Sequence, residues 1–120
     1  MPLYYSYDNM KIDFDNPRHE GLVNSFEVLE KKYNRKGIDH ATEILATLEV
    51  LKAASTLLDV PHFYRPHPLN GIYRGCFAVD VNNVQRMIFK PDEAKCPDFR
   101  IDTYRSIVAI IIIEIFKNYH

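Results

Sequence analysis

Hydrophobic positions near the start of the chain change their period, and each period predicts a type of secondary structure. Polar and apolar residues alternate from Lys11 to Phe14, which predicts a short strand. Asp15-Asn16-Pro17 then supplies a cap and an N-terminal proline, both typical of the start of a helix. An apolar stripe at helical spacing follows, formed by Leu22, Phe26, Leu29 and Tyr33. We therefore expect a strand and then a helix that ends at residues 34–37.

A second apolar stripe follows at once and predicts another helix, which continues to about Leu58. Its members are Ile38, Ala41, Ile44, Leu45, Leu48, Leu51 and Ala54. Because the connection between the two helices is short, we expect them to form an antiparallel hairpin. Three prolines, at positions 61, 66 and 68, then exclude a helix and predict a stiff, extended segment.

The rest of the chain has the signals of strands. Alternate apolar positions predict one strand over residues 72–81 and a returning strand over residues 84–89. Asn82-Asn83 between them can adopt the positive backbone angles of a tight hairpin turn. The returning strand would place Arg86 and Ile88 on one face and Met87 and Phe89 on the other. Residues 105–116 are so rich in isoleucine and valine that we expect a central strand buried on both faces.

This order of elements predicts an α+β fold. The N-terminal strand and the two-helix hairpin would pack on one side of a mainly antiparallel sheet of about four strands. The chain has 120 residues and no repeat or flexible linker divides it. We therefore expect one domain over residues 1–120, with residues 1–10 as a loose extension.

Charge is balanced over the whole chain but uneven along it. The 15 Lys+Arg and 16 Asp+Glu give a net charge of -1, which offers nucleic acid no overall attraction. Residues 60–90 differ, because they contain several basic residues and a single acidic residue, Asp80. The basic residues of this segment are Arg65, Arg74, Arg86 and Lys90, and His62 and His67 accompany them. A local positive field of this kind is what binding to a phosphate backbone requires.

Other features narrow the location and the chemistry. The longest apolar run covers residues 107–113, which is shorter than the roughly 18–20 residues of a membrane span, and no secretory signal is apparent. Cys76 and Cys96 form no CxxC pair, so we expect a reduced, cytoplasmic protein. His62 and His67 lack a zinc spacing and no glycine-rich phosphate loop is present. We expect neither a metal site nor a cofactor.

Three short motifs together resemble one family of proteins. The segment from His67 to Gly71 resembles the HPLxG turn that enters the sheet in HigB-type toxins of the RelE/ParE superfamily, the plasmid-maintenance killer proteins of toxin-antitoxin systems. Residues 85–89 are similar to the family's arginine strand, and residues 118–120 resemble its terminal Asp-Tyr-His. The resemblance spans residues 11–120 and includes the order of the elements.

The resemblance implies a RelE-like fold and a metal-independent endoribonuclease that cuts messenger RNA in the ribosomal decoding site. It also implies three partners: a cognate helix-turn-helix antitoxin, the ribosome and the message. Two alternatives stay open. One is a ParE-type toxin, which binds gyrase and has no use for catalytic histidines; the other is a catalytically weak toxin retained for its complex with the antitoxin.

The family's reaction, attack by a 2′-hydroxyl, needs a base, an acid and a cation beside the phosphate. The candidate catalytic residues are His67, Arg86, Tyr119 and His120. Histidine suits proton transfer because its ordinary pKa lies near ~6.5, and arginine suits the phosphate through its fork of donors. Tyr119 can stack on a base or donate its hydroxyl. Each candidate also has an ordinary structural explanation, namely a turn cap, a surface salt bridge or packing.

Four further residues are expected to contact RNA: Arg65, Arg74, Lys90 and Asn118. Two positions depart from the family pattern. Asn70 stands where many relatives carry lysine, and Asn118 replaces the usual aspartate and cannot act as a base. These departures leave fewer catalytic groups, so the strength of the nuclease is the open question.

Overall fold

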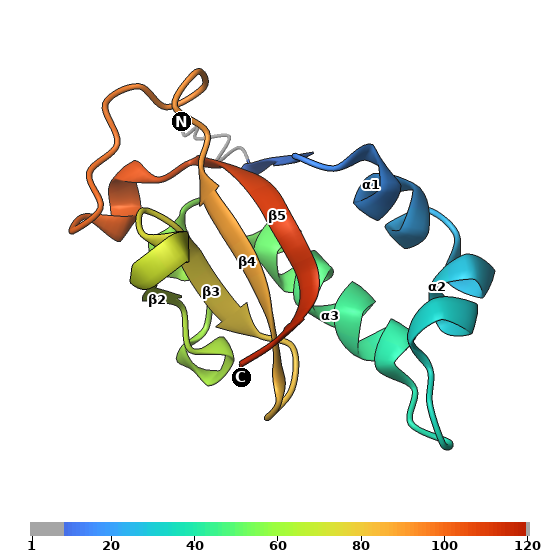
Figure 1. The fold of residues 1–120 in the computed structure, drawn as a ribbon. Coiled ribbons are helices and arrows are strands. Elements are labelled where there is room, and N and C mark those ends of the chain that lie inside the picture. The colour runs from blue at the N-terminus through green and yellow to red at the C-terminus, as the bar shows by residue number, and fades with distance from the viewer. Residues whose placement is uncertain (1–8, 120) are drawn as a thin grey trace, which may run out of the picture.

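The computed structural model describes residues 9–119, which form a five-stranded sheet with helices beside it and behind it (Figure 1). The helices are α1 (Pro17–Val23), α2 (Phe26–Tyr33) and α3 (His40–Ala53). The strands are β1 (Lys11–Phe14), β2 (His67–Pro68), β3 (Phe77–Asp80), β4 (Gln85–Pro91) and β5 (Ala109–Asn118). Short 3-10 turns lie at Leu57–Asp59, His62–Tyr64, Gly71–Tyr73 and Tyr104–Ser106. The predicted α+β class is confirmed.

The sheet has the order β1-β5-β4-β3-β2. Strand β1 pairs with β5 in parallel, and the other neighbouring pairs are antiparallel. The mainly antiparallel character was therefore predicted correctly, whereas the expected number of about four strands was too low. The strand that was missed is the two-residue β2, which is too short to produce an alternating pattern.

The region of the predicted two-helix hairpin has three helices, because the first predicted helix is interrupted. Helix α1 ends where the N–H of Asn24 donates to the carbonyl of Glu20 and the N–H of Ser25 donates to that of Leu22, and Ser25 takes an extended conformation before α2. The apolar spacing continues across this break, so periodicity alone could not reveal it. The second predicted helix begins at His40, after the cap Asp39, and ends at Ala53, five residues before the expected end.

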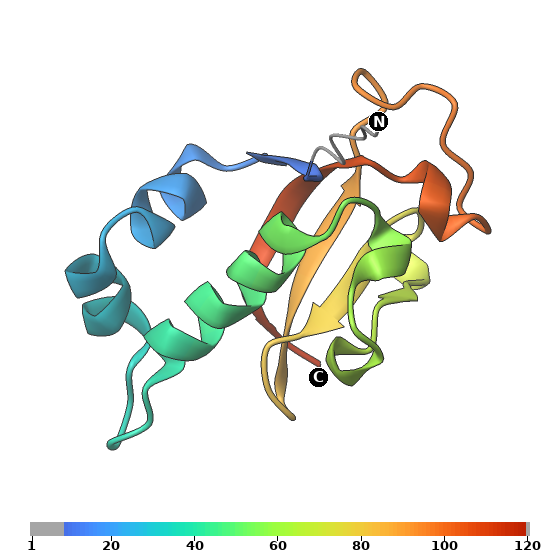
Figure 2. The same cartoon turned by 180° about the vertical axis from the view of Figure 1, so that it is seen from behind.

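Helix α3 lies across one face of the sheet, as the view from behind shows (Figure 2). Most of the hydrophobic core lies between them. Its fully buried members include Leu29, Ile44, Leu51, Phe77, Val79, Met87, Phe89, Ile110 and Ile112. Burying each of these side chains contributes about 1.5–3 kcal/mol, which makes the contact between helix and sheet the main source of stability.

We call the face of the sheet that points away from α3 the outer face. The burial of β5 on this face differs from the prediction. Ile110 and Ile112 are fully buried in the core, whereas Ile111 and Ile113 are only half-buried. The expectation of a strand buried on both faces is therefore wrong. The prediction for β4 is confirmed, since Met87 and Phe89 join the core cluster that packs under α3 and Arg86 does not; Ile88 lies outside that cluster but is also fully buried.

The connections on either side of β3 also differ from the predictions. Residues 71–73 form a 3-10 turn, so β3 begins only at Phe77. The β3–β4 turn has no positive φ; instead, Asn82 Oδ1 accepts hydrogen bonds from the N–H groups of Val84 (2.8 Å) and Gln85 (2.7 Å). Hydrogen bonds to the Asn82 side chain thus stabilise the turn, in place of the left-handed backbone that was expected.

The proline-rich segment is less extended than predicted. A 3-10 turn covers His62–Tyr64, and Arg65 follows with a left-handed φ of 49°. The chain becomes extended only at β2, where His67 pairs with Ala78 of β3. None of the helices within residues 9–119 is long and apolar enough to cross a membrane.

Candidate functional site

Polar and aromatic side chains gather at one end of the sheet, where β5 ends beside the β3–β4 turn. Asp80 of β3 pairs with Arg86 of β4, and Arg86 pairs with Lys117 of β5. Tyr119 follows β5, and its N–H donates to the carbonyl of Val84 (3.0 Å). This backbone bond holds the last described residue of the chain next to the start of β4.

Arg86 lies between groups that favour its charge without neutralising it. Its Cζ is 4.8 Å from the ring centroid of Tyr119 and 6.0 Å from that of Tyr73, both within cation-π distance. Its Nε is buried and has no hydrogen-bond partner within residues 9–119, and no ion pair in that range includes Arg86. Within these residues the guanidinium therefore has no ion-pair partner on the outer face of the sheet.

His67 contacts the same tyrosine. Its ring stacks on that of Tyr119, with 6.4 Å between the centroids and an interplanar angle of 10°. Its Nδ1 lies 2.6 Å from the carbonyl oxygen of Arg65. Because a carbonyl can only accept, Nδ1 carries the proton and donates, which leaves the lone pair of the neutral ring on Nε2.

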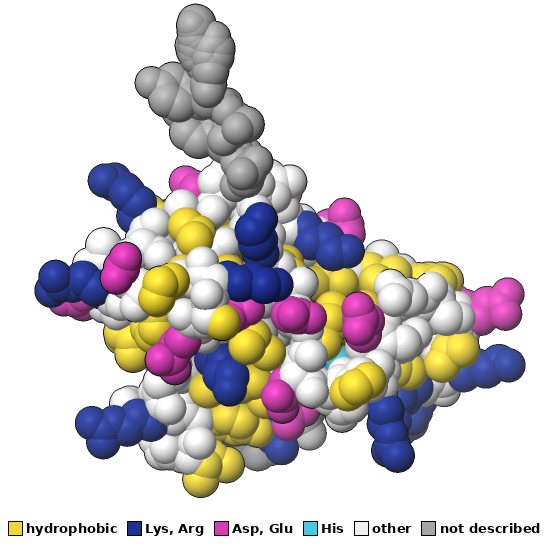
Figure 3. Space-filling view, turned by 90° about the horizontal axis from the view of Figure 1, so that it is seen from above, with side chains coloured by type: hydrophobic (Ala, Val, Ile, Leu, Met, Phe, Trp, Pro, Cys, Tyr) yellow, Lys and Arg dark blue, Asp and Glu magenta, His cyan; other side chains and the backbone are white. Residues whose placement is uncertain are grey.

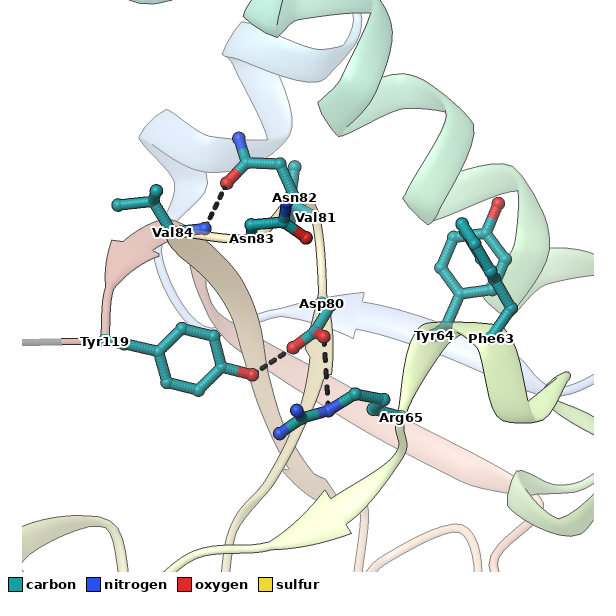
Figure 4. Close-up of a pocket in the computed structure, with 9 residues that line it drawn as sticks. All are labelled: Phe63, Tyr64, Arg65, Asp80, Val81, Asn82, Asn83, Val84 and Tyr119. Atoms are coloured by element: carbon teal, nitrogen blue, oxygen red, sulfur yellow. Dashed lines mark hydrogen bonds and ion pairs between the residues drawn. The ribbon is translucent and has the colours of Figure 1, made fainter.

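Asp80 connects Tyr119 with Arg65 (Figure 4). The hydroxyl of Tyr119 donates to Asp80 Oδ1, and Arg65 Nε lies 3.3 Å from Oδ2. Asp80 was not among the residues predicted for the site. The available signal was its position as the single acidic residue within residues 60–90, although only the strand pairing places it opposite Arg86.

The environment of Tyr119 keeps its hydroxyl protonated. Burial and the hydrogen bond to Asp80 raise the pKa of Tyr119 to about 12, against the opposite effect of Arg65 and Arg86. At neutral pH the group is therefore a phenol that donates a hydrogen bond, and it is not a base.

A pocket of about 510 Å³ opens beside this group (Figure 4). Aromatic side chains, a charged pair and the β3–β4 turn form its walls, which consist of Phe63, Tyr64, Arg65, Asp80, Val81, Asn82, Asn83, Val84 and Tyr119. The side chain of Phe63 is 84% exposed at its rim. An exposed aromatic ring beside two hydrogen-bonding residues is suited to stacking with a planar ligand.

The remaining predicted residues divide into near and distant ones. Asn118 directly precedes Tyr119, and its Oδ1 accepts from Gln85 Nε2 (2.9 Å). Lys90 is distant: it lies four residues from Arg86 along β4, roughly 13 Å at strand spacing. Its charge acts instead on Cys76, lowering a thiol pKa that burial raises by more. Arg74 is exposed beyond the turn at Gly71–Tyr73, and His120 lies outside the described residues.

Charge on the face seen from above (Figure 3) has no single sign. In the view from above, basic and acidic side chains are interspersed (Figure 3). Within the described part of the chain, no three His, Cys, Asp or Glu side chains are grouped so that they could hold a metal ion. A site for a negatively charged ligand would therefore depend on the local charge of Arg86.

Comparisons with known proteins leave the family open. No family model matches the chain, and no curated protein matches it. Among solved structures, it is similar to a crystal structure of a YafQ mutant from E. coli, with 16% sequence identity, a TM-score of 0.48, and coverage of 92% of this chain and 94% of that one. At this identity and TM-score, the likeness by itself assigns neither a family nor an activity.

Proposed function

We propose that this chain is a cytoplasmic toxin of the HigB/RelE type, which cleaves ribosome-bound messenger RNA without a metal and is neutralised by a cognate helix-turn-helix antitoxin. The observation that carries the proposal is the guanidinium of Arg86, which has no ion-pair partner within residues 9–119 and lies over Tyr119, the ring on which His67 stacks. The motif resemblance around His67, Arg86 and the chain end supports the same reading. A phosphate placed against Arg86 would lie close to the ring of Tyr119, which also contacts His67.

Arg86 would stabilise the phosphate as negative charge grows during the attack of the 2′-hydroxyl. Cation-π contacts hold its guanidinium in place and leave its positive charge available, because they supply no carboxylate. A preorganised donor of this kind costs no rearrangement when the charge develops. Removing one such donor typically lowers the rate about 10²–10³-fold.

His67 would act as the base. Its Nδ1–H is engaged by the carbonyl of Arg65, so Nε2 is the nitrogen that can take the proton of the 2′-hydroxyl. The acid that protonates the departing 5′-oxygen would be His120, which follows Tyr119 in the chain. Tyr119 would hold the cation and offer its ring, while its raised pKa excludes it from the role of base.

The pocket beside Tyr119 would accept a nucleobase of the bound message. Phe63 supplies an exposed ring on which a base can stack, a contact worth about 1–3 kcal/mol per base. Arg65 and Asn83 lie on other walls of the same pocket and can reach the edge of the base. The phosphate of that nucleotide would then lie towards Arg86, since Tyr119 borders both the pocket and the guanidinium.

The decisive experiment compares Arg86→Ala with Arg105→Ala, an exposed arginine in the 3-10 turn at Tyr104–Ser106. The wild-type protein, expressed without an antitoxin, should arrest growth and leave transcript ends inside translated codons. Arg86→Ala should abolish both effects and Arg105→Ala should retain them. Growth arrest with intact messages and stalled replication would reject the nuclease in favour of a gyrase-binding toxin.

A further inference from the structure

Asp80 closes a ring of contacts around the proposed catalytic group. Its Oδ1 accepts from the hydroxyl of Tyr119, and its Oδ2 pairs with the side chain of Arg65. The carbonyl of Arg65 accepts from Nδ1 of His67, and the ring of His67 stacks on that of Tyr119. The path thus returns to its starting residue, with each member of the ring contacting two others.

The carboxylate of Asp80 suits this position because it offers two separate acceptors. One holds the hydroxyl of Tyr119, which fixes the rotation of the ring that lies under Arg86. The other pairs with the guanidinium of Arg65, which follows the 3-10 turn at His62–Tyr64. Asp80 is half-buried at the end of β3, a strand fixed by its pairing with β4, so it provides a rigid origin for both contacts.

The backbone of Arg65 transmits the second contact to His67. Its φ of 49° is uncommon for a residue with a side chain, and such conformations persist where the surroundings determine them. In this conformation its carbonyl faces Nδ1 of His67, two residues later. The side chain of Arg65 is 64% exposed, so its ion pair alone contributes little stability and its effect lies in orientation.

We propose that Asp80 is a positioning residue, which orients Tyr119 directly and fixes the Nδ1–H form of His67 through Arg65. This inference rests on the proposed nuclease function for its kinetic consequence, although the contacts themselves do not depend on it. Asp80 lines the pocket, but it would act on the reaction through Tyr119 and His67. Its removal should therefore lower kcat by a larger factor than it changes KM.

A spectroscopic experiment tests whether the ring of contacts fixes the tautomer of His67. Long-range proton–nitrogen correlation spectra of the imidazole nitrogens, assigned with His67→Gln, should show the Nδ1–H form of His67 in the wild-type protein at alkaline pH. Asp80→Ala should give a mixture of the two neutral tautomers. Asp80→Asn should give an intermediate result, because its amide oxygen can still accept from Tyr119 while its NH2 group cannot pair with Arg65. Asp98→Asn, at an exposed loop position, is the matched control and should leave the spectrum unchanged.

Kinetics separate this inference from the proposed function. Asp80→Asn should lower kcat about 10-fold, and a double variant with Tyr119→Phe should lose less than the product of the two single effects, because both interrupt one ring. An unchanged tautomer and an unchanged kcat in both Asp80 variants, together with loss of cleavage in Arg86→Ala, would overturn the inference and retain the nuclease. A wild-type protein that does not cleave RNA, but whose His67 tautomer responds to Asp80, would overturn the nuclease and retain the ring.

Discussion

The guanidinium of Arg86 and the ring of Tyr119 form a cation-π pair, with 4.8 Å between Cζ and the ring centroid. The pair joins a strand residue to a residue beyond the last strand, and the N–H of Tyr119 on Val84 holds the two segments together. Tyr119 therefore serves the site in two separable ways. Its ring holds the cation, and its hydroxyl binds Asp80.

The two contributions of Tyr119 can be separated by substitution. Tyr119→Phe keeps the ring and loses the hydroxyl, whereas Tyr119→Leu loses both. A cation-π contact contributes about 0.5–2 kcal/mol, so Tyr119→Leu should cleave roughly 2- to 30-fold more slowly than Tyr119→Phe. Initial cleavage rates on ribosome-bound messages provide the measurement. Equal rates for the two variants would show that the ring has no part in holding Arg86.

The raised pKa of Tyr119 predicts a specific loss of stability at alkaline pH. Its pKa rises from an ordinary value of 10.0 to about 12 on folding, so the folded state favours the neutral phenol. The resulting stabilisation is present below pH 10 and is lost as the pH rises through about 12, with a slope of at most about 1.4 kcal/mol per pH unit. Denaturant unfolding at successive pH values should show a shallower decline for Tyr119→Phe. Identical declines in the two proteins would contradict the assignment.

Local patterns were sufficient to predict much of the fold. Alternation placed Arg86 on the face opposite Met87 and Phe89, and the core confirms this placement. The break at Asn24 was missed because the apolar stripe continues through it, and the half-buried face of β5 was missed because isoleucine occupies both faces. Composition cannot distinguish a fully buried isoleucine from a half-buried one.

The candidate site was only partly predictable for a different reason. His67 and Tyr119 belong to motifs that can be read along the chain, so sequence reasoning reached them. Asp80 and Tyr73 acquire their roles through strand pairing and through the 3-10 turn before β3, which brings Tyr73 to Arg86. Lys90 differs in the opposite way, since its charge was counted with the segment although four strand positions separate it from Arg86; its contact with RNA stays a prediction. Which side chains lie close together depends on the pairing register of the strands, and a single sequence does not reveal that register.

Asn82 should be the most sensitive residue of the β3–β4 turn. Its Oδ1 accepts from two backbone N–H groups, and its Nδ2 donates to Glu43 Oε1 of α3 (2.9 Å). Asn82→Ala would leave these groups unpaired and should lower the free energy of unfolding by about 1–3 kcal/mol. Asn83→Ala, at the exposed neighbouring position, should change it by less than about 0.5 kcal/mol. Urea denaturation of both variants tests the difference, and equal effects would show that the turn does not depend on the Asn82 side chain.

The division of labour between the two histidines can be tested with a modified message. A bridging sulfur in place of the scissile 5′-oxygen gives a better leaving group, which departs without protonation. A general acid contributes about 10²–10⁴-fold, so His120→Ala should lose that factor on the normal message and recover most of it on the sulfur-containing one. His67→Ala should stay slow on both messages, because the 2′-hydroxyl still needs a base.

His62→Ala is the matched control for both histidine variants. His62 is exposed on the turn before Arg65 and takes no part in the contacts of His67. The His62→Ala variant should cleave both messages at the wild-type rate. Recovery by the sulfur-containing message in His67→Ala, and none in His120→Ala, would reverse the two roles: His67, whose Nε2 faces away from the carbonyl of Arg65, would then be the acid. Loss of activity in neither variant would remove both histidines from the reaction and leave Arg86 as the main catalytic group of the site.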